Sequence, residues 1–299
     1  RTESNLANTV ELIGGSSMSL VMAAIQMTSS ARVEDNLKAA EHWVAKAHEQ
    51  GAQLVVLPEN FAIFDGGALF EAGENEATTG RLSNALAAWA KRYGVWIVGG
   101  TLPSRFRLAS SELVPGRRVR TRSAVYSPAG ECVAAYDKIH LFDVDVADAH
   151  GSYRESDAIE PGNLPVVAKL PDFGLGLTIC YDLRFPELFA HLRQLGASVI
   201  TVPSAFTYVT GKAHWLPLLQ ARAIETQCFI VAANQVGENR PSRRTWGHSC
   251  IISPWGEVLA LKEDGEGVVM ASVDLMQLEE VRKKMPVLQH KRFHVAMKE

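Results

Sequence analysis

The sequence predicts a layered α/β fold with largely buried sheets. Short apolar, β-branched runs alternate with amphipathic segments from residue 18 onward, and no linker divides them. The strands read as nearly continuous apolar runs, which is the pattern of strands covered on both faces. With 299 residues, 47% of them hydrophobic and 21% charged, the chain has ample material for such a core.

Helical and strand periods define the first half of this pattern. Between residues 33 and 50 apolar side chains recur every three or four positions, and Gly51 ends the run, as in an amphipathic helix. The turn residues SPAG at 127–130 split the segment 122–136 into two strands. The expected elements are strand 19–27, helix 33–50, strand 54–57, helix 81–92, strand 95–101 and the strand pair within 122–136.

The second half repeats the alternation of buried strands and helices. Pro186 stands at the first position of an expected helix, where its missing N–H costs no hydrogen bond. The expected elements are strand 175–180, helix 186–195, strand 198–202, helix 214–226, strand 229–234, three strands near 248–253, 257–262 and 267–273, and helix 275–284.

The first seventeen residues, RTESNLANTVELIGGSS, differ in character from the rest. They are acidic and polar, and they lack the basic and apolar regions of a secretory signal. The GGSS run at 14–17 has the composition of a flexible joint. We interpret residues 1–17 as a leader or an expression remnant, and we expect residues 18–299 to form a single domain.

Composition and charge indicate a small-molecule partner. The formal net charge is −3 and the basic residues are dispersed, so no footprint for nucleic acid or an anionic membrane is expected. The longest apolar runs are far shorter than the roughly 20 residues of a membrane-spanning helix. The 4 cysteines have neither CxxC spacing nor the density of a disulfide framework, which is typical of a reducing compartment. The sequence therefore predicts a cytoplasmic protein.

Three polar residues stand where an apolar strand ends. Glu59 follows LVVLP, Lys138 follows VAAYD, and Cys180 closes LGLTI. Ligands collect at strand ends in α/β sheets, although a lone cysteine with apolar neighbours is more often an inert core residue. The residues alone leave Cys180 open between a core thiol and a nucleophile. The other cysteines are expected in the core: Cys132, Cys228 and Cys250.

These three residue types permit attack on a carbonyl or nitrile carbon. A free thiol has a pKa of about 8.5 and needs an adjacent base or cation for activation. Glu59 would accept the thiol proton, and the Lys138 ammonium would stabilise the oxyanion of a tetrahedral intermediate. The backbone N–H of Tyr181 would be a second oxyanion donor. The product is a thioester that water hydrolyses, and the chemistry requires no metal and no organic cofactor.

The motifs around these residues are long and stand in a fixed order: LVVLPENF around Glu59, YDKIHLFD around Lys138 and LTICYDLRFPEL around Cys180. With them, from residue 18 to about 292, the sequence resembles the nitrilase, or carbon–nitrogen hydrolase, superfamily. The resemblance implies a four-layer α-β-β-α sandwich, often dimeric. It implies a triad with Glu59 as general base, Lys138 as oxyanion stabiliser or proton donor, and Cys180 as nucleophile. It also implies that Glu155, within YRES, helps to position substrate and water.

Within the superfamily, the C-terminal half is most similar to the deaminated-glutathione amidases. The shared stretches are PSAF at 203–206, GKAHW at 211–215, QARAIETQCF at 220–229, WGHS at 246–249, SPWGEV at 253–258 and MPVLQHKR at 285–292. Related amidases carry a glutamate after the His–Trp pair, whereas this chain has Leu216 and Pro217, either in the pocket wall or at a helix start. The omega-amidases, which act on amides such as 2-oxosuccinamate and 2-oxoglutaramate, are the alternative.

Residues near the nucleophile are further candidates. Arg184, Phe206 and Thr207 are candidates for substrate binding. For Arg184, an ion pair with Asp182 that holds the turn is favoured over contact with a substrate carboxylate. His140 lies two residues after the lysine, but a Cys–His mechanism is disfavoured because the Glu–Lys pair already supplies a base and an oxyanion partner.

Other charged residues are given structural roles. His290 and His294 have i, i+4 spacing but lack the acidic context of an HExxH motif, so no zinc site is expected. Arg240, Arg243 and Arg244 lie in a polar, proline-containing segment and are interpreted as a solvated turn.

The helix expected at 214–226 carries more apolar residues than one solvated helix should, which predicts a homodimer or a larger assembly.

Two hypotheses outside amidase chemistry are alternatives to the amidase function: a papain-type cysteine protease, and a non-catalytic binding protein on the same fold. All three triad residues are present, which favours an enzyme.

Overall fold

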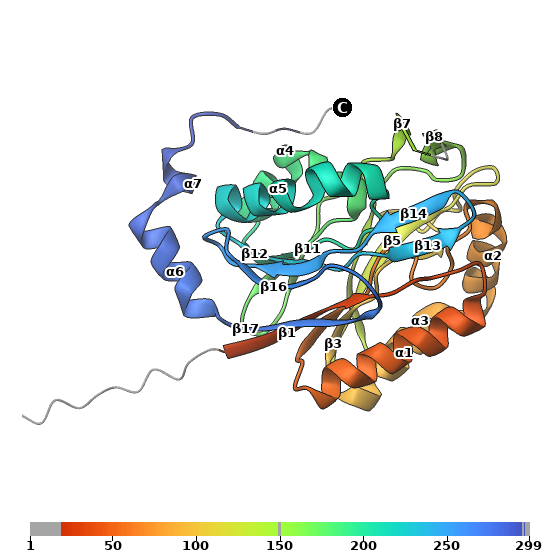
Figure 1. Ribbon diagram of the computed structural model, residues 1–299, viewed down its shortest axis with the longest axis horizontal. Helices are drawn as coiled ribbons and strands as arrows, with labels where there is room; N and C mark the ends of the chain where they lie inside the picture. The colour runs from red at the N-terminus through yellow and green to blue at the C-terminus, as the bar shows by residue number, and fades with distance from the viewer. Residues whose placement is uncertain (1–18, 149–150, 295, 297–299) are drawn as a thin grey trace, which may run out of the picture.

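Two β-sheets pack face to face, and helices cover the outer face of each, so the layers run α-β-β-α (Figure 1). The computed structural model describes residues 19–148, 151–294 and 296; the expected leader at 1–17 lies outside them. Helices α1 (Val33–Glu49) and α3 (Arg81–Tyr93) cover the first sheet, and α4 (Pro186–Gln194) and α5 (Tyr208–Thr226) cover the second. The expected fold class is confirmed.

The first sheet has the strand order β17-β1-β2-β3-β5-β4, and β6 also pairs with β5. Its centre is parallel, from β1 to β2 to β3, and its other pairs are antiparallel. The strands are β1 (Ser19–Gln26), β2 (Leu54–Val56), β3 (Trp96–Val98), β4 (Leu102–Ser104), β5 (Arg120–Tyr126), β6 (Cys132–Asp137) and β17 (Gly267–Asp274).

The second sheet follows the same plan, with the order β16-β15-β12-β11-β10-β9. The strands β10, β11 and β12 are parallel, because α4 and α5 each carry the chain back to the edge where the next strand begins. The strands are β9 (Val167–Lys169), β10 (Gly174–Leu177), β11 (Ala197–Thr201), β12 (Phe229–Ala232), β15 (Ser249–Ile252) and β16 (Val258–Lys262).

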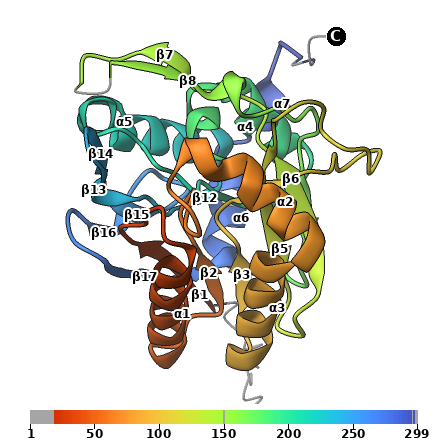
Figure 2. The same cartoon turned by 90° about the vertical axis from the view of Figure 1, so that its right-hand side faces the viewer.

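Two hairpins stand apart from these sheets, at the end of the sandwich that faces the viewer in Figure 2. One consists of β7 (Asp143–Asp145) and β8 (Ser152–Arg154), and the other of β13 (Val236–Arg240) and β14 (Arg243–Trp246). The remaining helices are α2 (Leu69–Thr79), α6 (Leu275–Lys284), α7 (Val287–His290) and the 3-10 turns Gly66–Ala68, Glu155–Asp157 and Cys180–Arg184. Within the described part of the chain, no helix is both long and apolar enough to cross a membrane.

Burial on both faces explains the continuous apolar run of β1. Met22 and Ala24 belong to the core between the two sheets, whereas Ala23 and Ile25 pack into the core beneath α1 and α3. All four side chains are fully buried. Successive side chains point to opposite faces of a strand, so a strand between two apolar layers needs apolar residues at every position.

Two of the boundaries that differ from expectation lie next to residues of interest. Strand β10 ends at Leu177, and Cys180 opens a 3-10 turn instead of closing the strand. Helix α5 begins at Tyr208 rather than at residue 214, with Thr207 as its N-cap; Thr207 Oγ1 accepts a hydrogen bond from Thr210 N at 3.4 Å. Pro217 therefore lies inside α5 and does not mark a helix start.

Candidate active site

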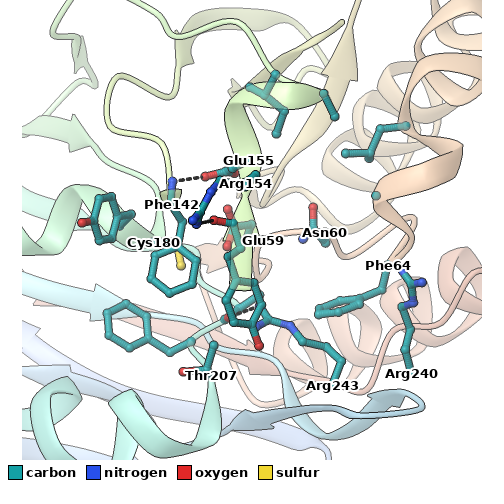
Figure 3. Close-up of a pocket in the computed structure, with 18 of the residues that line it drawn as sticks. Glu59, Asn60, Phe64, Phe142, Arg154, Glu155, Cys180, Thr207, Arg240 and Arg243 are labelled. Atoms are coloured by element: carbon teal, nitrogen blue, oxygen red, sulfur yellow. Dashed lines mark hydrogen bonds between the residues drawn. The ribbon is translucent and has the colours of Figure 1, made fainter. Parts of the chain in front are cut away.

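Four chain segments bring Glu59, Lys138, Glu155 and Cys180 to one cavity of about 420 Å³ (Figure 3). Glu59 lies in the loop after β2 and Lys138 directly follows β6, both from the first sheet. Cys180 follows β10 of the second sheet, and Glu155 directly follows β8 of the hairpin. The structure thus brings together the three residues that were expected at strand ends and Glu155, which was expected from the resemblance alone.

A buried ammonium bridges two carboxylates at the base of the cavity. Lys138 Nζ donates to Glu59 Oε1 at 2.8 Å and to both oxygens of Glu155 at 2.8 and 2.9 Å. Only 2% of Lys138 is exposed. Burial alone would lower the pKa of Lys138, but the negative charges of Glu155 and Glu59 outweigh it and raise this pKa well above its usual range. The lysine is therefore a fixed positive charge.

The lysine is held by its own backbone. Lys138 N donates to Thr121 O at 2.9 Å, which continues the pairing of β6 with β5, and Gly162 N donates to Lys138 O at 2.7 Å. A Cβ on Gly162 would lie 2.1 Å from Asp137 O, so only glycine permits this approach. These contacts fix the point from which the side chain enters the cavity.

Glu155 is fixed on two sides. Besides the lysine, its Oε2 accepts a hydrogen bond from Phe142 N at 2.6 Å. Burial raises the pKa of Glu155; the Lys138 charge opposes this rise and the nearby Glu59 adds to it. A carboxyl group with such partners is well placed to orient a substrate or a water molecule but has little freedom to move.

Cys180 sits where a backbone turn exposes it to the cavity. Its φ of 46° lies in the left-handed region, and its N–H donates to Pro203 O at 2.9 Å. Burial raises the pKa of the Cys180 thiol well above its usual range, the Glu59 charge adds to the rise, and Lys138 opposes it. The resting sulfur is thus a neutral thiol beside a carboxylate that is able to accept its proton.

A buried carboxylate holds the turn that carries the thiol. Asp182 accepts hydrogen bonds from Ile179 N at 2.9 Å, from the Tyr136 hydroxyl at 2.7 Å and from His140 N at 3.1 Å. His140 Nδ1 lies 2.7 Å from the same carboxylate. The expected ion pair of Asp182 with Arg184 is therefore wrong: the carboxylate is fully buried and its partners come from β6 and the loop after it.

The three candidates for substrate binding all line the cavity. The Arg184 guanidinium lies 5.8 Å from the Tyr181 ring and 5.5 Å from the Phe206 ring, and its Nη1 is 3.2 Å from His214 Nδ1. Thr207 is almost fully buried. Leu216 and Pro217 do not line the cavity, so the departure from related amidases lies outside its wall.

Arg240 and Arg243 also line the cavity, which corrects their interpretation as a solvated turn. They lie on the hairpin of β13 and β14, whose paired residues include Arg240 with Arg243 and Val236 with Trp246. Arg244 is exposed and lies outside the cavity lining, but it belongs to β14 and its guanidinium carbon lies 4.1 Å from the Tyr208 ring, so it is not in a turn either. The run VGENRPSRRTW holds a Pro-Ser turn between two polar strands. Neither strand has the apolar face by which a hairpin is recognised in a sequence.

The other cysteines divide into two classes. Cys228 and Cys250 are buried as expected, but Cys132 on β6 is exposed, so its assignment to the core is wrong. Among the described residues, no three His, Cys, Asp or Glu side chains are grouped so that they would hold a metal ion. His290 is the last residue of the short helix α7.

Known proteins are similar to this chain over most of its length. Residues 21–283 match the carbon–nitrogen hydrolase family. The chain is 44% identical over 272 residues to the deaminated glutathione amidase of Yersinia enterocolitica, covering 91% of this chain and 93% of that protein. It is 37% identical over 283 residues to the deaminated glutathione amidase of Homo sapiens, covering 94% and 85%.

Solved structures show the same fold. The C. elegans NitFhit protein superposes with a TM-score of 0.82 at 31% identity, covering 94% of this chain and 68% of that one. Saccharomyces cerevisiae Nit3, a member of branch 10 of the nitrilase superfamily, superposes with a TM-score of 0.80 at 27% identity, covering 92% and 97%. By sequence and by fold, this chain belongs to the carbon–nitrogen hydrolase family.

Proposed function

We propose that this protein is an amidase that hydrolyses deaminated glutathione to 2-oxoglutarate and cysteinylglycine through a thioester on Cys180. The observation that carries the proposal is one buried ammonium, Lys138, in contact with Glu59 and Glu155 beside a buried thiol. This set supplies a nucleophile, a base and an oxyanion partner in one cavity. The relatives from Yersinia enterocolitica and Homo sapiens carry the name of this activity.

In the first half-reaction, Cys180 Sγ attacks the amide carbonyl carbon while its proton passes to Glu59. The carbonyl oxygen becomes an oxyanion that Lys138 Nζ and the Tyr181 N–H stabilise. Tyr181 is the second residue of the 3-10 turn, and N–H groups in a first helical turn have no acceptor within the helix. The C–N bond then breaks, the leaving nitrogen takes the proton from Glu59, and the acyl group stays on sulfur as a thioester.

In the second half-reaction, water attacks the thioester carbonyl. Glu59 takes a proton from the water, the C–S bond breaks, and the thiolate recovers that proton as 2-oxoglutarate leaves. Glu155 accepts from Phe142 N and Lys138, which leaves it fixed toward the cavity where the attacking water and the substrate lie. Both half-reactions use the same carboxylate as base and then as acid.

Charge separates deaminated glutathione from glutathione. Glutathione carries an α-ammonium where the deaminated form carries a 2-oxo group. A cavity that already holds the Lys138 ammonium disfavours a second buried cation, because its desolvation finds no partner. A buried hydrogen-bond donor of the cavity that the wrong substrate leaves unpaired costs about 1–3 kcal/mol, which corresponds to roughly a ten- to hundredfold lower rate.

We therefore expect kcat/KM for deaminated glutathione to exceed that for glutathione by at least about tenfold. Initial rates of 2-oxoglutarate and dipeptide release, measured side by side for deaminated glutathione, glutathione and 2-oxosuccinamate, test this. Equal values for the first two would contradict the charge explanation. A higher value for 2-oxosuccinamate would make the protein an omega-amidase.

The proposal extends to a cytoplasmic location, one domain at 18–299 and a homodimer or larger assembly. Trp215 and Leu219 of α5 pack inside the chain, so they do not support assembly as expected. Ile224 of α5 and Trp255 remain 54% and 60% exposed, and a partner chain would cover them. We expect light scattering at micromolar concentration to give at least a dimer mass; a sharp monomer mass would contradict assembly.

A further inference from the structure

The cavity carries more positive than negative charge. Five cationic side chains line it beside three carboxylates, so its net charge is +2, whereas the whole chain carries −3. A concave site with an excess of one sign attracts ligands of the other sign. The cations are Lys138, Arg154, Arg184, Arg240 and Arg243.

Three of these cations already have carboxylate partners. Lys138 contacts Glu59 and Glu155, as described above. Arg240 Nη1 lies 3.0 Å from Asp65 Oδ1, and Arg154 Nη2 lies 3.0 Å from Asp145 Oδ1. In the described part of the chain, the other two guanidinium groups, those of Arg184 and Arg243, have no carboxylate within 4.0 Å.

Arg243 is held rigidly with one donor left over. Its Nη2 donates to Ala205 O at 3.0 Å, and its guanidinium carbon lies 4.7 Å from the Tyr153 ring and 5.7 Å from the Phe64 ring. Its Nη1 is buried and has no hydrogen-bond partner among the described residues. Arg243 lines the cavity, and no carboxylate among the described residues neutralises its charge, so a ligand carboxylate would supply the missing counter-charge.

The two guanidinium groups come from different elements of the fold. Arg184 belongs to the same 3-10 turn as Cys180 and packs against Phe206, next to the position of the acyl group in the thioester. Arg243 comes from the hairpin of β13 and β14 and enters beside Phe64 and Arg240 (Figure 3). Both groups contact the segment Ala205–Phe206, Arg243 at the carbonyl of Ala205 and Arg184 at the ring of Phe206.

We propose that Arg243 binds the carboxylate at the far end of the leaving amine, so that the preferred substrate is a dianion with one carboxylate on each side of the scissile amide. Arg184 then receives the carboxylate of the 2-oxo acid. This inference rests on the proposed function, because deaminated glutathione carries its second carboxylate on the glycine of the dipeptide. It makes Arg243 a specificity-determining residue, since a guanidinium binds a carboxylate through two parallel N–H donors.

The test compares deaminated glutathione with the same molecule capped as a glycinamide, which removes only the distal charge. For the wild type, capping should lower kcat/KM by about ten- to a hundredfold, mainly through KM. For Arg243→Gln, deaminated glutathione should lose about the same factor, and capping should then have little further effect. Arg244→Gln is the matched control, because Arg244 is exposed on the same strand and lies outside the cavity lining.

Each result decides between the alternatives. Equal losses for both substrates in Arg243→Gln would overturn the assignment to the leaving group, as would no loss at all. If the wild-type protein cleaves both substrates equally well, Arg243 does not bind the distal carboxylate. This comparison needs no variant, so it also decides the question if Arg243→Gln does not fold. A wild type that cleaves neither but hydrolyses another 2-oxo acid amide would show that the proposed function failed.

Discussion

Replacement of Cys180 by alanine should lower kcat by at least about a thousandfold and leave the fold intact. Alanine removes the only atom that forms the thioester, while the turn remains held by Asp182 and by the hydrogen bond from residue 180 N to Pro203 O. Glu59→Gln should lose turnover to a similar extent, because the neutral thiol needs a proton acceptor. Steady-state kinetics and circular dichroism on the purified variants measure both quantities.

A variant that keeps more than about a tenth of the wild-type kcat, a loss under about 1.4 kcal/mol, would contradict its assigned role. Alkylation with iodoacetamide gives an independent measurement, and it must be made in a Cys132→Ser background because Cys132 is exposed and would react as well. Cys180 should be alkylated faster than Cys228 and Cys250, and Glu59→Gln should slow its alkylation. A scaffold protein would show no preference for Cys180.

Replacement of Lys138 by methionine should have the second large effect, on activity and stability together. It leaves Glu59 and Glu155 buried with no cation between them, so we expect kcat to fall at least about a hundredfold and the free energy of unfolding to fall by about 3–5 kcal/mol. Burial already raises the pKa of Glu155, and the variant loses the Lys138 charge that opposes this rise. The destabilisation should therefore be greatest at neutral pH and lessen as the pH falls and the carboxylates bind protons.

Urea denaturation at pH 7 and pH 5, together with kcat, measures this prediction. Lys169→Met, a change at an exposed lysine on β9, is the matched control and should change neither quantity. Full activity in Lys138→Met would favour the papain-type alternative, in which a histidine activates the sulfur. His140, two residues after the lysine, is the histidine considered above, but its Nδ1 faces the Asp182 carboxylate, and its ring stacks on Phe185 with the ring centroids 3.7 Å apart.

Sequence reasoning located the candidate catalytic residues because each follows a local signal. Glu59, Lys138 and Cys180 end apolar runs, and in a sheet buried on both faces such runs have clear ends. The resemblance to the superfamily then added Glu155, which follows a short polar strand with no apolar run to mark it. Pattern alone could not have distinguished this glutamate from a solvated one.

The features that sequence reasoning missed depend on contacts between distant segments. Asp182 pairs with His140, which lies 42 residues away in the sequence. Nothing in the local sequence pattern favours this partner over Arg184, which is two residues away. The sequence predicts a surface residue at Arg243, whereas the rings of Phe64 and Tyr153, which belong to other elements, pack against its guanidinium. Periodicity reports which face of an element is apolar, and it carries no information about what covers a polar strand.

The pairing of β1 with β17 has a consequence for how the molecule assembles during synthesis. Gln26 pairs with Gly267 and Ser19 with Asp274. One edge of β1 therefore stays unpaired until β17, near the end of the chain, has been translated. At translation rates of about 5–20 residues per second, that wait is on the order of 10 to 50 seconds. Throughout it, an apolar strand presents unpaired backbone groups to other chains. We therefore expect the yield of active protein to be limited by aggregation of nascent chains, and slower synthesis at low temperature or chaperone capture of the N-terminal half to raise it.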